Sequence, residues 1–275
     1  MNLSRRKFVK RLAWGSLAVA TGSLVYPTLI EPRRVGVTRL RVGIRNLPAA
    51  FDGLRVAHLT DFHRSHYVSH EYLTHCVELA NDLDADLVLL TGDYLTHGHT
   101  DRGRRVYGGD DEAEAHLRDC AGILRAVRAR HGVFASLGNH DHWYDGDRVT
   151  RQLQTDGIPV LRNTRAEVRI DGQTLPVVGL GDLWTDGVDF KRAFAGVSEQ
   201  FSLVLMHNPD SFEHWAQPGA HLILSGHTHG GQVNLPLVGP PLVPSRYGAK
   251  YAQGLFRRGD AVMYVNRGLG TIFPP

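Results

Sequence analysis

The stretch LRVAHLTDFH, residues 54–63, joins an apolar run directly to a carboxylate and an imidazole. Leu54–Thr60 has the nearly continuous apolar character of a buried strand, and Asp61 and His63 follow it at once. Alternate residues at a strand end can point to the same side, so these two side chains can reach one ion. An Asp-x-His pair also occurs by chance, so its meaning depends on whether the arrangement recurs along the chain.

Four further apolar runs end in the same manner. They are Leu87–Leu90 before Gly92-Asp93, Gly132–Leu137 before Gly138-Asn139-His140-Asp141, Phe201–Met206 before His207, and His221–Leu224 before Gly226-His227-Thr228-His229-Gly230-Gly231. Singly, most have ordinary structural explanations, such as a polar turn at Asn139 or a helix start after His207. Two histidines flanked by glycines have little structural purpose except binding. Together the five motifs favour a metal site.

The segments between these runs predict an α/β fold. Apolar spacing predicts amphipathic helices after Ser69 and around Leu117, and Asp171-Gly172 predicts a hairpin turn. The alternation in Val37–Ile44 predicts a half-exposed strand. No repeat or linker divides residues 36–275, which we therefore interpret as one domain. Sheets of this class place active residues just beyond the carboxyl ends of their strands, where each motif lies.

The motifs, in this order, resemble those of the calcineurin-like metallophosphoesterase superfamily over residues 54–270. Within it the chain looks closest to the exported bacterial branch of YaeI- and YkuE-like phosphodiesterases. The resemblance implies a four-layer α/β/β/α sandwich of two mixed sheets. It also implies a ligand set in which Asp61, His63 and His229 hold one metal, Asn139, His207 and His227 hold the other, Asp93 bridges both, and His140 faces the scissile phosphate.

The implied function is binuclear metal-dependent hydrolysis of a phosphodiester or pyrophosphate, by attack of a metal hydroxide on phosphorus, with His140 as the catalytic residue. Mixed nitrogen and oxygen ligands suit two ions of Mn, Fe or Zn. His97, His99 and His142 are candidate substrate contacts. A phosphomonoesterase is the alternative enzyme, and a non-catalytic metal-binding scaffold of the envelope is the alternative outside enzymes. Because Asp93 and His140 are both intact, the enzyme is favoured.

The N-terminus resembles a twin-arginine (Tat) export signal. Ser4-Arg5-Arg6-Lys7-Phe8-Val9-Lys10 precedes a run without charge at residues 12–30. We therefore expect residues 1–35 to act as a Tat-type signal or N-terminal anchor. The Tat machinery is then a partner, and the location is periplasmic or otherwise extracytoplasmic. The 19 uncharged residues lie near the lower limit for a membrane span, so both cleavage and membrane anchoring by residues 12–30 remain open.

The charge of the chain gives no support to nucleic acid as a partner. The formal net charge is +3, but residues 1–35 hold seven of the 31 basic residues and one of the 28 acidic ones. Residues 36–275 therefore carry 24 basic and 27 acidic side chains, a net charge of −3. A slightly acidic body gives a nucleic-acid-binding surface no support, so we expect no nucleic acid as a partner. The expected partner is a phosphoester substrate of the envelope, lipid- or nucleotide-linked.

Overall fold

The computed structural model describes Trp14 and residues 31–98, 109–197, 201–234 and 238–272. The chain divides into two compact units, Met1–Thr38 with Phe273–Pro275, and Arg39–Ile272. The first unit contributes one short 3₁₀ helix to the described residues, η2 (Glu31–Arg33). The predicted export motif at Arg5-Arg6 lies outside the described residues. Among the residues that are described, no helix combines the length and apolar character needed to cross a bilayer.

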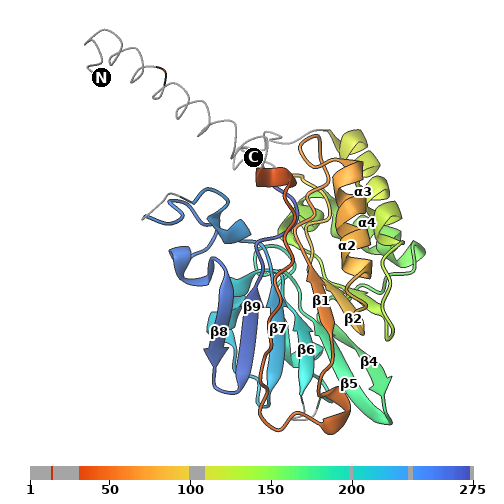
Figure 1. The fold of residues 1–275 in the computed structure, drawn as a ribbon, viewed down its shortest axis with the longest axis vertical. Helices are drawn as coiled ribbons and strands as arrows, with labels where there is room; N and C mark the ends of the chain where they lie inside the picture. Colours follow the sequence, from red (N-terminus) through yellow and green to blue (C-terminus); the bar gives the residue numbers. More distant parts are fainter. Residues whose placement is uncertain (1–13, 15–30, 99–108, 198–200, 235–237, 273–275) are drawn as a thin grey trace, which may run out of the picture. The chain divides into compact units, whose positions relative to one another are not determined.

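The second unit is built on two β-sheets (Figure 1). The first sheet has the order β1-β2-β3 and is parallel, with strands β1 (Val56–Leu59), β2 (Leu87–Leu90) and β3 (Val133–Ala135). The second has the order β4-β5-β6-β7-β9-β8 and is mixed, with strands β4 (Thr164–Ile170), β5 (Gln173–Gly179), β6 (Ser202–Leu205), β7 (His221–Ser225), β8 (Gly254–Arg258) and β9 (Ala261–Val265). In this sheet β4 and β8 pair antiparallel with their neighbours, and the other pairs are parallel.

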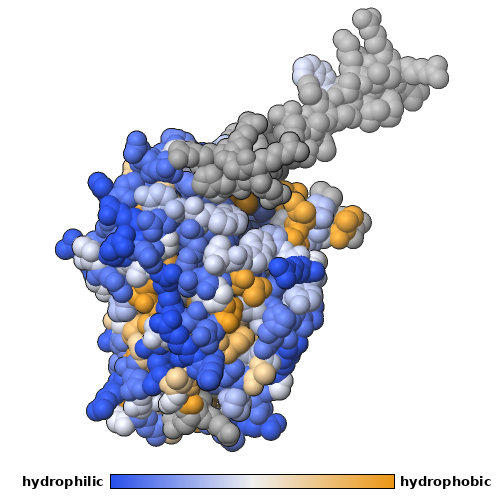
Figure 2. Space-filling model, turned by 180° about the vertical axis from the view of Figure 1, so that it is seen from behind, coloured by the Kyte–Doolittle hydropathy of each residue, from blue (hydrophilic) through white to orange (hydrophobic). Residues whose placement is uncertain are grey.

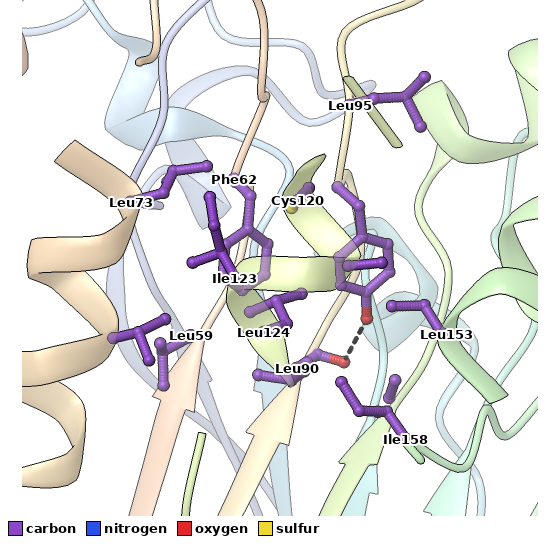
Figure 3. Packing of buried hydrophobic residues seen from close by; sticks show 14 of the residues in the cluster. Leu59, Phe62, Leu73, Leu90, Leu95, Cys120, Ile123, Leu124, Leu153 and Ile158 are labelled. Atoms are coloured by element: carbon purple, nitrogen blue, oxygen red, sulfur yellow. Dashed lines mark hydrogen bonds between the residues drawn. The ribbon is translucent and has the colours of Figure 1, made fainter. Parts of the chain in front are cut away.

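Three helices cover one face of the first sheet: α2 (His70–Asn81), α3 (Asp110–Leu124) and α4 (Asn139–Thr155). The helix predicted after Ser69 is confirmed, because the Ser69 hydroxyl accepts from the Tyr72 amide (3.3 Å) and caps α2. Figure 3 shows the packing beneath these helices, where Leu73, Leu124 and Leu153 lie with strand residues such as Leu59 and Leu90.

Alternation along β2 separates two hydrophobic cores. Val88 and Leu90 pack with the helices, whereas Leu87 and Leu89 face the second sheet, and all four side chains are buried. A third cluster covers the far face of the second sheet, around Trp215. It includes residues of α5 (Phe190–Ala193), η4 (Pro209–His214) and η6 (Gly248–Tyr251). The predicted α/β/β/α sandwich is confirmed, with an outermost layer of short helices.

Two local predictions have opposite outcomes. The hairpin is confirmed, because β4 and β5 pair antiparallel around Asp171 (φ 48°) and Gly172 (φ 78°), the left-handed pair that a tight two-residue turn requires. The strand predicted for Val37–Ile44 is wrong, because no ladder pairing includes these residues. An alternating pattern can specify a face, but a strand also needs a neighbouring edge, and no described strand supplies one.

Candidate metal centre

The two sheets meet where β1, β2, β6 and β7 end, because hydrogen bonds join the residues that follow these strands. The Asp61 amide donates to the Gly92 carbonyl oxygen (3.0 Å), and the His227 amide donates to the Asp61 carboxylate (2.9 Å). The His207 ring donates through Nδ1 to the Thr91 carbonyl oxygen (2.6 Å). These contacts gather all eight residues predicted for the site: Asp61, His63, Asp93, Asn139, His140, His207, His227 and His229.

Within this cluster, three sets of three side chains each present ligand atoms within 4.8 Å of one another. They are Asp61, His63 and His229; Asp93, His207 and His227; and His63, Asp93 and His140, which overlaps the other two. The Nε2 atoms of His63 and His229 are 3.0 Å apart, and His229 Nε2 is 3.4 Å from Asp61 Oδ1. Ligands about 2.1 Å from one ion lie about 3.0–3.4 Å from one another. Two of the three distances fit a shared cation as they stand, and the third, from His63 Nε2 to Asp61 Oδ1, is 4.0 Å.

The Asp93 carboxylate belongs to two of these sets and connects the His63 side of the cluster with the His207 side. Its Oδ2 atom is 3.4 Å from His63 Nε2 and 3.3 Å from His207 Nε2, while its Oδ1 atom accepts from the His140 amide (2.9 Å). Asn139 belongs to the His207 side, with its Oδ1 atom 3.3 Å from His207 Nε2. One oxygen of Asp93 is thus held by the backbone, and the other faces both groups of ligands.

Hydrogen bonds at Nδ1 orient three of the imidazoles. His63 Nδ1 is 3.1 Å from the Thr96 hydroxyl, and His207 and His140 donate through Nδ1 to backbone carbonyl oxygens. A donor at Nδ1 leaves the lone pair of a neutral ring on Nε2, the nitrogen that faces the cluster. His227 Nε2 is buried and has no hydrogen-bond partner among the described residues. Such a buried acceptor without a partner suits a metal ligand.

The protonation states of the clustered histidines also suit the binding of cations. Burial lowers the pKa values of His63, His140 and His227, which favours neutral imidazoles with free lone pairs. His207 differs. Burial alone would lower its pKa, but the Asp93 carboxylate outweighs burial and raises the pKa of His207 to about 10. Without a cation, the proton on His207 partly neutralises Asp93.

The backbone at the site is strained in a way that serves the side chains. Five of the clustered residues have positive φ angles: Asp61 at 52°, His63 at 46°, Asp93 at 56°, His227 at 71° and His229 at 51°. Each such residue costs roughly 1–2 kcal/mol relative to the right-handed regions. Space is equally tight, since a methyl group at Gly226 would overlap the Asp61 carboxylate and the Thr60 hydroxyl. Strain and close approach together favour a functional centre over a plain turn.

Asp141 is a positioning residue to which the sequence pattern gave no role. Its buried carboxylate accepts from the backbone amides of Asp93, Tyr94 and Gly138, each at 2.8 Å. It thereby ties the residues after β2 to the start of α4, which carries Asn139 and His140. The signal available in the sequence was its place at the end of the Gly138-Asn139-His140-Asp141 motif.

The remaining candidate substrate contacts are placed differently. The carbonyl oxygen of His97 accepts from His140 Nδ1 (2.5 Å), so His97 orients His140 through its backbone. His142 is half-buried on α4 with its ring against Gly146, and burial lowers its pKa. His99 lies outside the described residues. Contact of these three histidines with substrate stays a prediction.

Replacing Asp141 by asparagine should destabilise the protein. An amide offers one acceptor oxygen and presents an NH₂ group to backbone N–H donors, so we expect the free energy of unfolding to fall by about 2–3 kcal/mol. Urea denaturation of the metal-free protein measures this change. The exposed Asp145 is the control, because Asp145→Asn retains the oxygen that accepts from the Arg148 amide. Equal stabilities of the two variants would contradict the role assigned to Asp141.

Comparison with known proteins agrees with this geometry. The family model described as calcineurin-like phosphoesterase matches residues 54–231. The chain is 32% identical to "Uncharacterized metallophosphoesterase YkuE" of Bacillus subtilis, over 98% of this chain and 91% of the relative. It is 30% identical to "Phosphodiesterase YaeI" of Escherichia coli, over 98% and 94%. It is 26% identical to "UDP-2,3-diacylglucosamine pyrophosphatase LpxG" of Chlamydia trachomatis, over 92% and 89%.

The matched segment begins just before β1 and ends just after His229, so it includes every residue of the cluster. Two relatives at or above 30% identity extend over nearly the whole chain. The chain is therefore a member of the calcineurin-like phosphoesterase family, a family of metal-dependent phosphoester hydrolases.

Proposed function

We propose that this protein is a binuclear metal-dependent hydrolase of phosphodiesters or pyrophosphates. The observation that carries the proposal is the position of Asp93 Oδ2 between His63 Nε2 and His207 Nε2. One set of ligands is Asp61, His63 and His229, the other is Asn139, His207 and His227, and Asp93 joins them through Oδ2. Nitrogen and oxygen donors without a thiolate suit Mn²⁺, Fe or Zn²⁺.

Two cations held by these residues would supply positive charge to the phosphoryl group and would lower the pKa of a water molecule. The chain's own residues supply orientation. His140 lies edge-to-face against His63, with ring centroids 4.8 Å apart, and the His97 carbonyl oxygen fixes its Nδ1. Protonated at Nε2, as the negative charge of a bound phosphoryl group favours, the His140 ring donates to a phosphoryl oxygen or passes the proton to the leaving oxygen. His140 is thus the catalytic residue that we assign outside the ligand sets.

The proposed substrate is a diester or pyrophosphate of the cell envelope, lipid- or nucleotide-linked. Two findings support it: YaeI is named a phosphodiesterase, and LpxG is named a pyrophosphatase of UDP-2,3-diacylglucosamine. The export motif at Arg5-Arg6 supports an extracytoplasmic location reached through the Tat machinery. Residues 12–30 then serve as a cleaved signal or as a membrane anchor.

Asp93→Asn should abolish diester hydrolysis, because an amide cannot supply the charge that two cations share. The full chain, loaded in turn with Mn²⁺, Zn²⁺ or Fe²⁺, should cleave bis-p-nitrophenyl phosphate, and the variant should lose activity on the order of 100-fold or more. Asp171→Asn in the hairpin turn is the matched control. Cleavage of p-nitrophenyl phosphate alone would indicate a phosphomonoesterase. Two bound ions without any hydrolysis would indicate a scaffold protein.

His140→Gln separates catalysis from metal binding. We expect kcat for bis-p-nitrophenyl phosphate to fall about 100- to 1,000-fold, because a proton donor and phosphoryl contact is lost. Metal content, measured by mass spectrometry, should stay at two ions per chain, because in the proposed assignment both ions keep their ligands without His140, although its ring also lies near His63 and Asp93. His75→Gln, an exposed position on α2, is the control. Unchanged turnover in His140→Gln would remove His140 from the mechanism.

If the chain is exported by the Tat route, its export should depend on the arginine pair Arg5-Arg6. Arg5→Lys with Arg6→Lys should keep the chain in the cytoplasm, because Tat signals require both guanidinium groups. Arg33→Lys with Arg34→Lys conserves the same charge and should be exported normally. Fractionation of a bacterial host detects the difference. Equal export of the two double variants would contradict the Tat assignment.

A further inference from the structure

Two tryptophans lie directly against the candidate centre. The Trp143 ring packs on His140 with centroids 4.7 Å apart, and the Trp184 ring packs on His227 with centroids 4.3 Å apart. The two indoles are nearly parallel, at 24°, with centroids 6.5 Å apart. Each is 38% exposed, although both are large and apolar. A substrate whose phosphate reaches His140 therefore meets two partly exposed indoles beside its scissile bond.

The position of Trp184 is fixed by a buried carboxylate. Asp182 is 1% exposed, and its Oδ2 atom accepts from the Trp184 amide (2.9 Å) and from the Thr185 hydroxyl (3.0 Å). Its Oδ1 atom is buried without a hydrogen-bond partner among the described residues. The turn after β5 thus holds the indole in place before any substrate binds, which reduces the entropy lost on binding.

A surface hollow of about 440 Å³ extends from Trp184, lined by Leu183, Trp184, Pro244, Ser245 and Arg246. The lining residues Ser245 and Arg246 are also held by a buried carboxylate. The buried Asp210 accepts from the Ser245 hydroxyl (2.6 Å) and from the Arg246 amide (2.7 Å). The Arg246 guanidinium itself is exposed and has no hydrogen bond or ion pair with the described residues. None of the described residues that line the hollow is acidic, so the guanidinium is available to an anionic ligand.

We propose that this hollow binds the nucleotide half of the substrate, a nucleoside diphosphate derivative. The base lies against the exposed indole faces of Trp184 and Trp143, and the second phosphate binds the Arg246 guanidinium. Stacking on an aromatic face suits any base, and an unpaired guanidinium suits an oxyanion. An acyl chain fits less well, because Ser245 and Arg246 make one wall polar. The inference rests on the proposed hydrolase, since that activity places the scissile phosphate at His140.

Competitive inhibition of bis-p-nitrophenyl phosphate cleavage measures each contact separately. Uridine 5′-monophosphate and ribose 5-phosphate differ only in the base, so their inhibition constants isolate stacking. Uridine diphosphate and uridine monophosphate differ in the second phosphate, so they isolate the guanidinium. In the unmodified enzyme, we expect the base to tighten binding at least about fivefold, and the second phosphate to tighten it about fivefold.

The variants should remove one contact each. Trp184→Leu should raise the inhibition constant of uridine monophosphate at least about fivefold, without changing that of inorganic phosphate, and Trp184→Phe should restore most of the loss. Arg246→Gln should remove the advantage of the diphosphate and leave the monophosphate unchanged. Arg257→Gln, on the exposed side of β8, is the charge-matched control and should change neither constant.

Failure of the subsite is distinct from failure of the hydrolase. If bis-p-nitrophenyl phosphate is cleaved but uridine monophosphate and ribose 5-phosphate inhibit equally, the base contact is wrong and the proposed function stands. If an acylated glycerol phosphate inhibits in a Trp184-dependent manner while the nucleotides do not, the hollow belongs to a lipid substrate. If no diester is cleaved, calorimetric titration of the metal-loaded protein with uridine diphosphate decides the subsite, and absence of binding overturns it.

Discussion

The rest of the candidate centre depends on the position of the Asp93 carboxylate. Its Oδ2 atom is within 3.4 Å of an imidazole nitrogen from each ligand set, and its Oδ1 atom is held by the His140 amide. The Asp93 amide in turn donates to Asp141. A shift of this one side chain would separate the two groups of ligands, because among the described residues only Asp93 belongs both to a set with His63 and to the set with His207.

The fold supplies this position by bringing two sheets together at their strand ends. Asp93 follows β2 of the first sheet, and His207 follows β6 of the second, so packing of the sheets sets the distance between them. That packing rests on Leu87 and Leu89 of β2, which are fully buried against residues of β5 and β6. Burial of apolar surface between the sheets contributes the free energy that offsets strained backbone and buried carboxylates at the edge.

In the proposed function, the metal ligands and the residues that recognise the substrate come from different parts of the chain. The ligand sets come from residues directly after strands, where backbone hydrogen bonds leave little freedom. The proposed nucleotide subsite comes from the turn after β5 and from the segment around Ser245, each held by one buried aspartate, Asp182 or Asp210. Such loops can change without disturbing the metal ligands. This arrangement allows members of one family to keep a reaction and differ in substrate.

The sequence by itself determined the strand ends and the residue types at them. Asp61 and His63 follow one apolar run and His227 and His229 follow another, and both local patterns could be recognised without knowing which strands are neighbours. Only the tertiary structure decided that Asp141 supports Asp93, that Asp182 fixes Trp184, and that Arg246 lines the same hollow as that indole. The prediction of a strand at Val37–Ile44 was wrong for the same reason, because a strand needs a neighbouring strand edge to pair with. Periodicity is a property of neighbouring residues, whereas each of these contacts depends on how separate segments pack in three dimensions.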